Sequence, residues 1–136
     1  MDFGQIDTAK DSNEGATYHV IDPYTDEPAY ATVKDKDVPV TITVLGPDSD
    51  KMRQFQSQML KAMMKKRKGQ SMEADELERK MTSQLVEAIT GWTGFLVNGE
   101  TIECNRDNSA ELLNKHYWLR EQLLAFQQER ANFLKK

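Results

Sequence analysis

Apolar and polar positions alternate most clearly over residues 38–45, where valine, isoleucine and leucine are interleaved with threonine. This period of two predicts a half-buried strand. Residues 17–22 are β-branched and aromatic and predict another strand, and we expect the two strands to pair antiparallel across a proline-containing turn at 22–28. Residues 1–16 are polar and small, which indicates a flexible N-terminal arm. Residues 29–38 form a charged connection whose pattern is ambiguous.

Apolar spacings of three and four residues predict helices over most of the remaining chain. After the acidic entrance at 47–50, the first apolar helix face consists of Met52, Phe55, Met59 and Met63. Basic residues then close this helix before Gly69, where the helix dipole favours positive charge. These residues are Lys65, Lys66, Arg67 and Lys68. The next apolar face consists of Leu77, Met81, Leu85, Val86 and Ile89, and a final helix that reaches almost to the end is marked by Trp118, Leu119, Leu123, Phe126 and Phe133.

Two local signals complete the predicted architecture. Asn98-Gly99 lies between short apolar runs and suits the tight turn of a β-hairpin over residues 95–102. Residues 105–108 offer capping groups for a short helix. We therefore predict an α+β fold: a small N-terminal antiparallel sheet, then a predominantly helical part with a short hairpin. The arm at 1–16 is followed by a single domain at 17–136.

Composition narrows the classes of protein that this chain can represent. It has 136 residues, a formal net charge of −4 and a hydrophobic fraction of 38%, and its mean hydropathy is −0.71. The acidic balance argues against a general nucleic-acid binder, and the low hydrophobic content indicates a small core. One cysteine excludes an internal disulfide framework. An apolar stretch long enough to span a membrane and a signal peptide are both lacking, so we expect a cytoplasmic protein.

The charge is unevenly distributed along the chain. Residues 51–68 hold seven bases and no acid, whereas residues 1–50 hold eleven acids and three lysines. The simplest interpretation is a core-packed helix with a solvated basic end. The other is a protein-binding helix, because methionine side chains adapt to varied apolar partners. The residues of this candidate partner-binding site are Met52, Phe55, Met59, Met63, Lys65, Lys66, Arg67 and Lys68. Pairing of opposite charges between copies would give a homo-oligomer.

Catalytic and metal-binding patterns find no support in the sequence. It lacks a glycine-rich phosphate loop, an HExxH motif and a GxSxG motif. His19 and His116 are isolated from each other, and Cys104 has no base nearby in the chain. We therefore expect a protein that is not an enzyme and that uses no cofactor or metal.

Several segments together resemble the tail assembly chaperones of long-tailed bacteriophages and their prophages. The resemblance covers most of the chain, in order, and it rests on residues 2–7, 41–50, 91–94, 108–113, 118–122 and 130–134. The third of these is Gly91-Trp92-Thr93-Gly94, which precedes the Asn-Gly hairpin. These are packing and capping residues, and the resemblance lies in their combination.

The resemblance implies a non-enzymatic role in virion assembly. Proteins of this family bind the tape measure protein, keep its apolar helical faces soluble, help to recruit the major tail protein and leave before the tail is complete. This chain would correspond to the shorter product of a frameshifted gene, found in the host cytoplasm and absent from the mature virion. The alternatives are a structural tail-completion or head–tail joining protein, and a small nucleic-acid-binding regulator that uses the lysines of residues 61–68.

Overall fold

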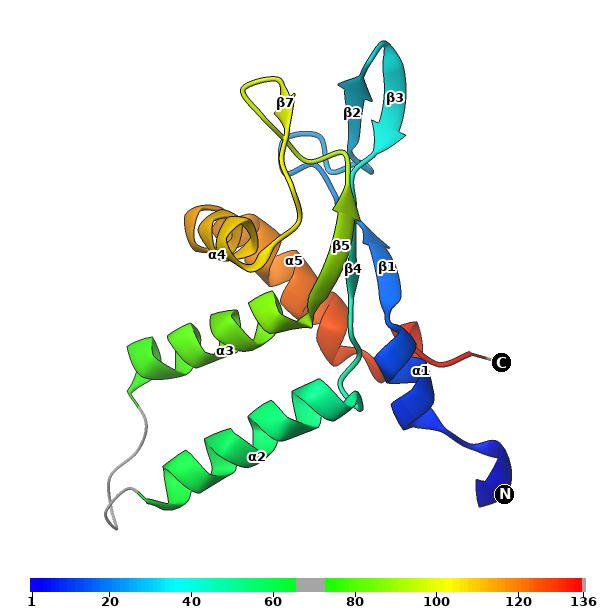
Figure 1. The fold of residues 1–136 in the computed structure, drawn as a ribbon, viewed down its shortest axis with the longest axis vertical. Helices are drawn as coiled ribbons and strands as arrows, with labels where there is room; N and C mark the ends of the chain where they lie inside the picture. The colour runs from blue at the N-terminus through cyan, green and yellow to red at the C-terminus, as the bar shows by residue number, and fades with distance from the viewer. Residues whose placement is uncertain (66–72, 136) are drawn as a thin grey trace.

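The computed structural model describes residues 1–65 and 73–135, and its architecture is the expected α+β fold (Figure 1). In chain order the elements are η1 Phe3–Gln5, α1 Thr8–Glu14, β1 Ala16–His19, β2 Tyr30–Val33, β3 Lys36–Pro39, β4 Thr41–Val44, α2 Asp50–Met64, α3 Ala74–Ala88, β5 Ile89–Thr93, β6 Leu96–Val97, β7 Glu100–Thr101, α4 Arg106–Lys115, α5 Tyr117–Gln128 and η2 Arg130–Asn132.

A three-stranded antiparallel sheet in the order β1-β4-β5 forms the centre of the molecule. The predicted pairing of the first two strands is confirmed, with Tyr18 opposite Ile42. The third strand, β5, was not predicted, because glycines at 91 and 94 weaken the strand pattern around Trp92-Thr93. In the structure Gly91 pairs with Thr43 inside the sheet. Only Gly94 takes the left-handed conformation, at a φ of 73°.

The region 29–45 divides differently from the prediction. The expected strand at 38–45 is two strands, β3 and β4, and β3 pairs with β2 in a separate hairpin. The turn of this hairpin has positive φ at both Lys34 and Asp35, 51° and 65°. Positive φ is usual for glycine or asparagine and unusual for lysine. The residue types of this turn therefore did not predict a hairpin. By contrast, the Asn98-Gly99 turn between β6 and β7 has the two positive φ values that were predicted.

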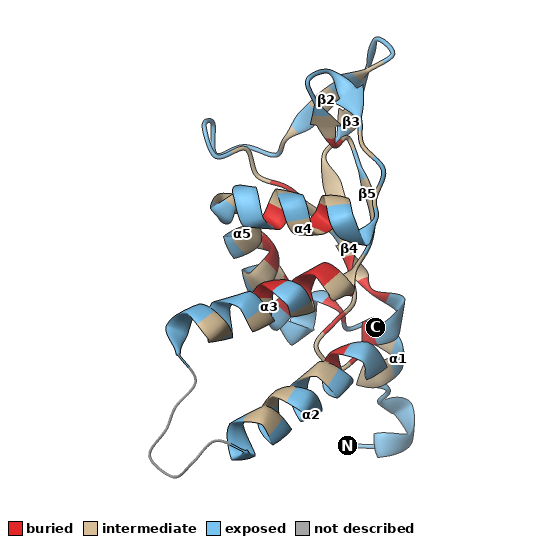
Figure 2. Ribbon diagram, turned by 60° about the vertical axis from the view of Figure 1, so that its left-hand side comes forward, coloured by how far each residue is buried: buried red, intermediate tan, exposed pale blue. Residues whose placement is uncertain are grey.

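The two faces of the three-stranded sheet have opposite character. One face presents threonines that form hydrogen-bonded pairs. The hydroxyl oxygens of Thr17 and Thr43 are 2.8 Å apart, and those of Thr41 and Thr93 are 2.6 Å apart. The other face is apolar and packs against the helices. The buried core consists of Val20, Ile42, Val44, Met52, Leu85, Val86, Ala88, Phe95, Leu113, Leu119, Leu123 and Phe133 (Figure 2).

The N-terminal segment is less detached than expected. Residues 8–14 form α1, which starts at the side-chain cap of Asp7. Ser12 of this helix is fully buried, and its carbonyl accepts a hydrogen bond of 2.9 Å from the Gly46 amide. A Cβ at Gly46 would meet the Ser12 side chain at 2.5 Å, so the glycine permits this close approach. Glycine at position 46 thus creates the docking site of α1, a contact between distant segments that the polar composition of residues 1–16 did not indicate.

The C-terminal segment is docked, as expected, although its helix is shorter than predicted. α5 ends at Gln128, and the chain continues through η2 to Phe133, which is 1% exposed. The ring of Phe133 lies 5.5 Å from that of Phe126, centroid to centroid. The backbone amide of Lys135 then donates to Asp11 of α1 at 3.1 Å. The two ends of the domain therefore lie side by side (Figure 1).

Candidate protein-binding site

α2 and α3 extend together from the sheet as a helical hairpin, and their position decides which side chains of the predicted site are accessible (Figure 1). Ser49 caps the start of α2, and its hydroxyl accepts a hydrogen bond from the Met52 amide at 3.2 Å. Near the sheet the hairpin is buried against the core, and its far halves are largely exposed (Figure 2). Exposure of the apolar residues on α2 therefore increases with distance from the sheet.

The residues of the predicted site differ in exposure according to their distance from the sheet. Met52 is completely buried in the core and is not available to a partner on the surface. Phe55 and Met59 are half-buried and line a shallow hollow of about 150 Å³ against Lys80 of α3. Met63 is 53% exposed.

The predicted basic end is described only in part. Lys65 directly follows α2 and is exposed. Lys66, Arg67 and Lys68 lie outside the described residues.

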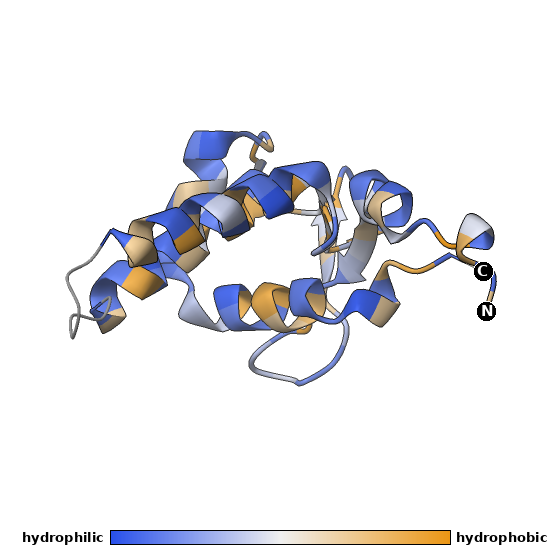
Figure 3. Cartoon of the chain, turned by 90° about the horizontal axis from the view of Figure 1, so that it is seen from below, coloured by the Kyte–Doolittle hydropathy of each residue, from blue (hydrophilic) through white to orange (hydrophobic). Residues whose placement is uncertain are grey.

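The predicted set of site residues lacks two exposed apolar residues of α2. Leu60 and Met64 are 59% and 76% exposed, and with Met63 they occupy positions i, i+3 and i+4 of the helix. Such positions are neighbours on one side of a helix. The spacing was visible in the sequence, but these residues lay off the apolar face that begins at Met52. We call Leu60, Met63 and Met64 the α2 tip. Hydrophobic and hydrophilic residues are interleaved along the helices of the hairpin as far as the end of α2 (Figure 3).

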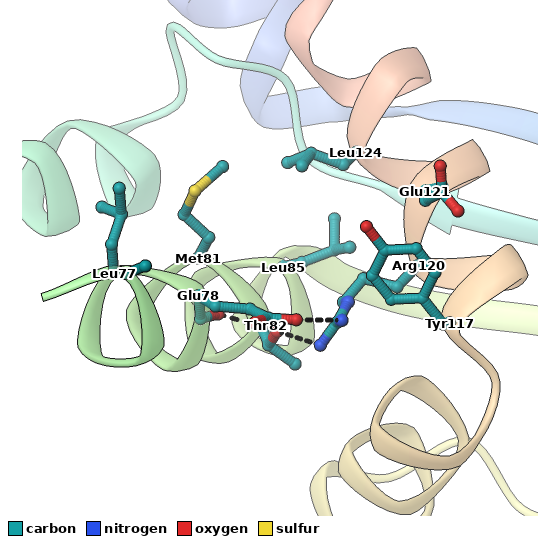
Figure 4. A pocket seen from close by; sticks show the side chains of 10 residues that line it. Leu77, Glu78, Met81, Thr82, Leu85, Tyr117, Arg120, Glu121 and Leu124 are labelled. Atoms are coloured by element: carbon teal, nitrogen blue, oxygen red, sulfur yellow. Dashed lines mark hydrogen bonds and ion pairs between the residues drawn. The ribbon is translucent and has the colours of Figure 1, made fainter.

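A second apolar surface lies between α3 and α5. It is an open groove of about 320 Å³ with an apolar floor formed by Ala74, Leu77, Met81, Leu85, Tyr117 and Leu124. In Figure 4 Leu77, Met81 and Leu85 of α3 point into the space that Leu124 and Tyr117 border from α5. We call this the α3–α5 groove. Its α3 residues were predicted as the apolar face of a helix, but only the packing of α3 against α5 shows that part of this face remains uncovered.

Arg120 fixes one wall of the α3–α5 groove. Its guanidinium forms an ion pair with Glu78 and donates a hydrogen bond of 3.0 Å to the Thr82 hydroxyl (Figure 4). It also lies 4.6 Å from the centroid of the Tyr117 ring, within the range of a cation–π contact. Three interactions thus hold this cation, and the charge of Glu78 is compensated. The remaining acid of the groove wall, Glu121, is exposed.

A smaller hollow continues the groove towards α2. It has a volume of about 150 Å³ and shares Met81, Leu85 and Leu124 with the groove. Its other lining residues are Pro47 and four glutamines, Gln56, Gln84, Gln127 and Gln128. The uncovered surface is therefore apolar near the hairpin end and becomes polar towards the sheet.

The two histidines and the cysteine that were considered for catalysis belong to separate parts of the fold, and their contacts there are structural. The Nε2 atom of His19 is 2.7 Å from the Ala29 carbonyl oxygen, and His116 precedes α5 beside Trp118. Burial raises the pKa of the Cys104 thiol, although a hydrogen bond with Ser109 acts in the opposite direction, and a raised pKa makes a thiol less reactive. Within residues 1–65 and 73–135, no cluster of three or more histidine, cysteine or acidic side chains could hold a metal ion.

Comparisons with protein-family models, with curated proteins and with solved structures gave no match to this chain. Among the described helices, none combines the length and apolarity that crossing a membrane requires. The site is therefore characterised by its own geometry: an exposed apolar tip on a basic helix and an apolar groove beside it.

Proposed function

We propose that this chain is a tail assembly chaperone of a long-tailed bacteriophage or prophage, which binds the tape measure protein without catalysing a reaction. One structural observation carries the proposal, namely that three exposed apolar side chains lie together at the α2 tip. Leu60, Met63 and Met64 are each more than half exposed on a helix that projects from the domain. The resemblance described above supplies the identity of the client.

The chemistry of the α2 tip suits a long helical client. An amphipathic helix presents apolar side chains at intervals of three and four residues, and it is commonly bound by a complementary helix face or groove. Two methionines and a leucine can adapt to a stripe that varies along the client, because methionine is unbranched and polarisable. Lys61 and Lys65 beside the tip keep it hydrated and contribute little to affinity. Binding of this kind would be adaptable and readily reversible, as a chaperone that leaves the assembled tail requires.

Co-expression with the tape measure protein of the same phage tests the proposal. We expect the client, insoluble alone, to be recovered in a soluble complex with this chain. A Leu60→Asp/Met64→Asp variant should fold normally, because both side chains are exposed, but should leave the client insoluble. Tyr24→Asp is the control for an added carboxylate in place of an exposed apolar side chain, since Tyr24 is 96% exposed in a turn away from the hairpin. A client that stays insoluble with the parent chain would refute the proposed function.

The mature particle separates this proposal from a structural role. A chaperone that acts in the host cytoplasm should be absent when purified virions are analysed by mass spectrometry. A tail-completion or head–tail joining protein should be present in a fixed ratio to the major tail protein. Stoichiometric presence of the chain in the virion would favour the structural role over the chaperone.

A further inference from the structure

The α3–α5 groove is an apolar surface that the described chain leaves open. Leu77 and Tyr117 border it and are 39% and 58% exposed. Burial of apolar surface is favourable by roughly 25 cal/mol per Å², so this surface favours an apolar occupant. The groove is open to solvent along one side, and its volume is about 320 Å³. An occupant helix would therefore lie along the opening and insert side chains.

The charged residues around the groove indicate the sign of the charge that an occupant should carry. Residues 73–78, at the start of α3, hold four acids and no base. Glu121 of α5 adds a carboxylate that has no hydrogen-bond or ion-pair partner among the described residues. Of the cations nearby, Arg120 is already bound to Glu78 and Thr82, whereas Arg79 lines a separate hollow beside Asp75 and not the groove itself. The groove therefore suits an apolar helix that carries basic residues at its side.

The same chain presents such a helix at the α2 tip. Lys61 is three residues before Met64 and four before Lys65, so these side chains are neighbours on α2. The α2 tip is thus apolar with a basic edge, whereas the groove is apolar with an acidic edge. Both surfaces lie at the same end of the hairpin, because α2 finishes at Met64 and α3 starts at Ala74 (Figure 1).

We propose that the α2 tip of one copy docks into the α3–α5 groove of a second copy, and that the exchange is reciprocal. Reciprocal docking makes the contact self-complementary, as a two-fold dimer requires. The apolar parts meet at the centre, and Lys61 and Lys65 face Glu73 and Glu121 at the edge. Because the surfaces are small, the association is weak and reversible. In the dimer the exposed apolar side chains of the α2 tip are covered, so a client that binds this tip competes with the second copy, and the weak dimer dissociates when the client binds.

Charge reversal followed by charge exchange tests this contact. Lys61→Glu/Lys65→Glu should weaken self-association, measured by sedimentation velocity over a range of concentrations, by about tenfold, which equals about 1.4 kcal/mol. Glu73→Lys/Glu121→Lys should weaken it by a similar factor, and Glu73 makes no side-chain cap to α3 whose loss would complicate the result. The variant with all four changes has the parent net charge of −4, and its dimer should be restored.

A matched control separates the specific contact from the effect of total charge. Lys34→Glu/Lys36→Glu changes the net charge as much as the α2 variant but lies on the β2–β3 hairpin, and it should leave self-association unchanged. A parent chain that remains monomeric at every concentration at low salt would overturn the proposal. So would failure of the fourfold variant to recover, provided that circular dichroism shows it to be folded.

The proposal stands independently of the client, because every one of these measurements uses the chain alone. If the tape measure protein were the occupant of the groove, Glu73→Lys/Glu121→Lys would impair co-expression of the soluble client complex and leave self-association at the parent level. That result would overturn the second-copy proposal and leave the chaperone function intact. Failure of co-expression with normal self-association would refute only the chaperone function.

Discussion

Gln122 offers a sharp test of how the helices are fixed to the sheet. Its side-chain oxygen accepts hydrogen bonds from the Tyr18 hydroxyl at 3.0 Å and from the Ile21 amide at 2.9 Å. Its side-chain nitrogen donates to the Ile21 carbonyl at 2.9 Å. One amide on α5 thus satisfies both backbone groups of Ile21 near the end of β1. Gln122→Met keeps a side chain of similar length and removes all three hydrogen bonds.

The expected cost follows from these contacts. A typical intramolecular hydrogen bond contributes about 0.5 to 1.5 kcal/mol net. The three bonds are part-buried, so water partly replaces them in the variant. We therefore expect the free energy of unfolding to fall by about 2 to 3 kcal/mol. For a chain of this length the melting temperature changes by about 3 to 5 °C per kcal/mol, which gives a decrease of about 6 to 15 °C.

Urea unfolding and amide hydrogen exchange together measure this effect. The exchange of the Ile21 amide should become faster in Gln122→Met beyond the loss of global stability, because its acceptor is gone. Gln128→Met is the control, since Gln128 is exposed at the end of the same helix and the two residue types have similar helix propensity. A loss below about 0.5 kcal/mol in Gln122→Met, or an equal loss in the control, would refute the reasoning.

Three further predictions test the core, the charge network and the backbone. Met52→Ala should lower the free energy of unfolding by about 2 to 5 kcal/mol, whereas Met64→Ala should change it by less than about 0.5 kcal/mol, because the first side chain is buried and the second is 76% exposed; equal effects in urea unfolding would contradict this. The hydrogen bond from Arg130 holds the pKa of Asp48 below its usual value of 3.8, so its stabilisation is present above that value and is lost as the pH falls through the lowered pKa. Stability should therefore decrease less steeply on acidification in Asp48→Asn than in the parent, and identical pH profiles would exclude this contribution. Gly94→Ala should cost about 1 to 3 kcal/mol, because Gly94 has a φ of 73° and a Cβ there would lie 2.9 Å from a backbone oxygen of β3; an unchanged melting temperature would argue against it.

Local patterns in the sequence were enough to predict those elements whose formation depends on a few neighbouring residues. The alternation around residues 41–44 identified β4, and the Asn98-Gly99 pair identified the β6–β7 turn. The capping groups at residues 105–108 indicated a helix start, and in the structure Asn105 caps α4 by accepting a hydrogen bond from the Asn108 amide at 2.8 Å. Each signal acts over a few residues, so it can be recognised without knowledge of the fold.

Tertiary structure decided the features that depend on distant parts of the chain. Gly91 belongs to a strand because β4 pairs with it, and α1 docks because Gly46 leaves room for Ser12. The same limit applied to the candidate site. Met52 and Met63 share a helix face in the sequence pattern, yet one is completely buried and the other is 53% exposed. The periodicity specifies which way a side chain points, whereas its burial depends on whether another element lies there.

The sequence by itself determined that this is an α+β protein with a methionine-rich basic helix and no catalytic signature. The structure decided that this helix projects from the domain, that its exposed apolar patch is Leu60, Met63 and Met64, and that an acid-edged groove lies between α3 and α5. The physical reason is that amphipathicity is a property of one segment, whereas a groove exists only where two segments meet without filling the space between them.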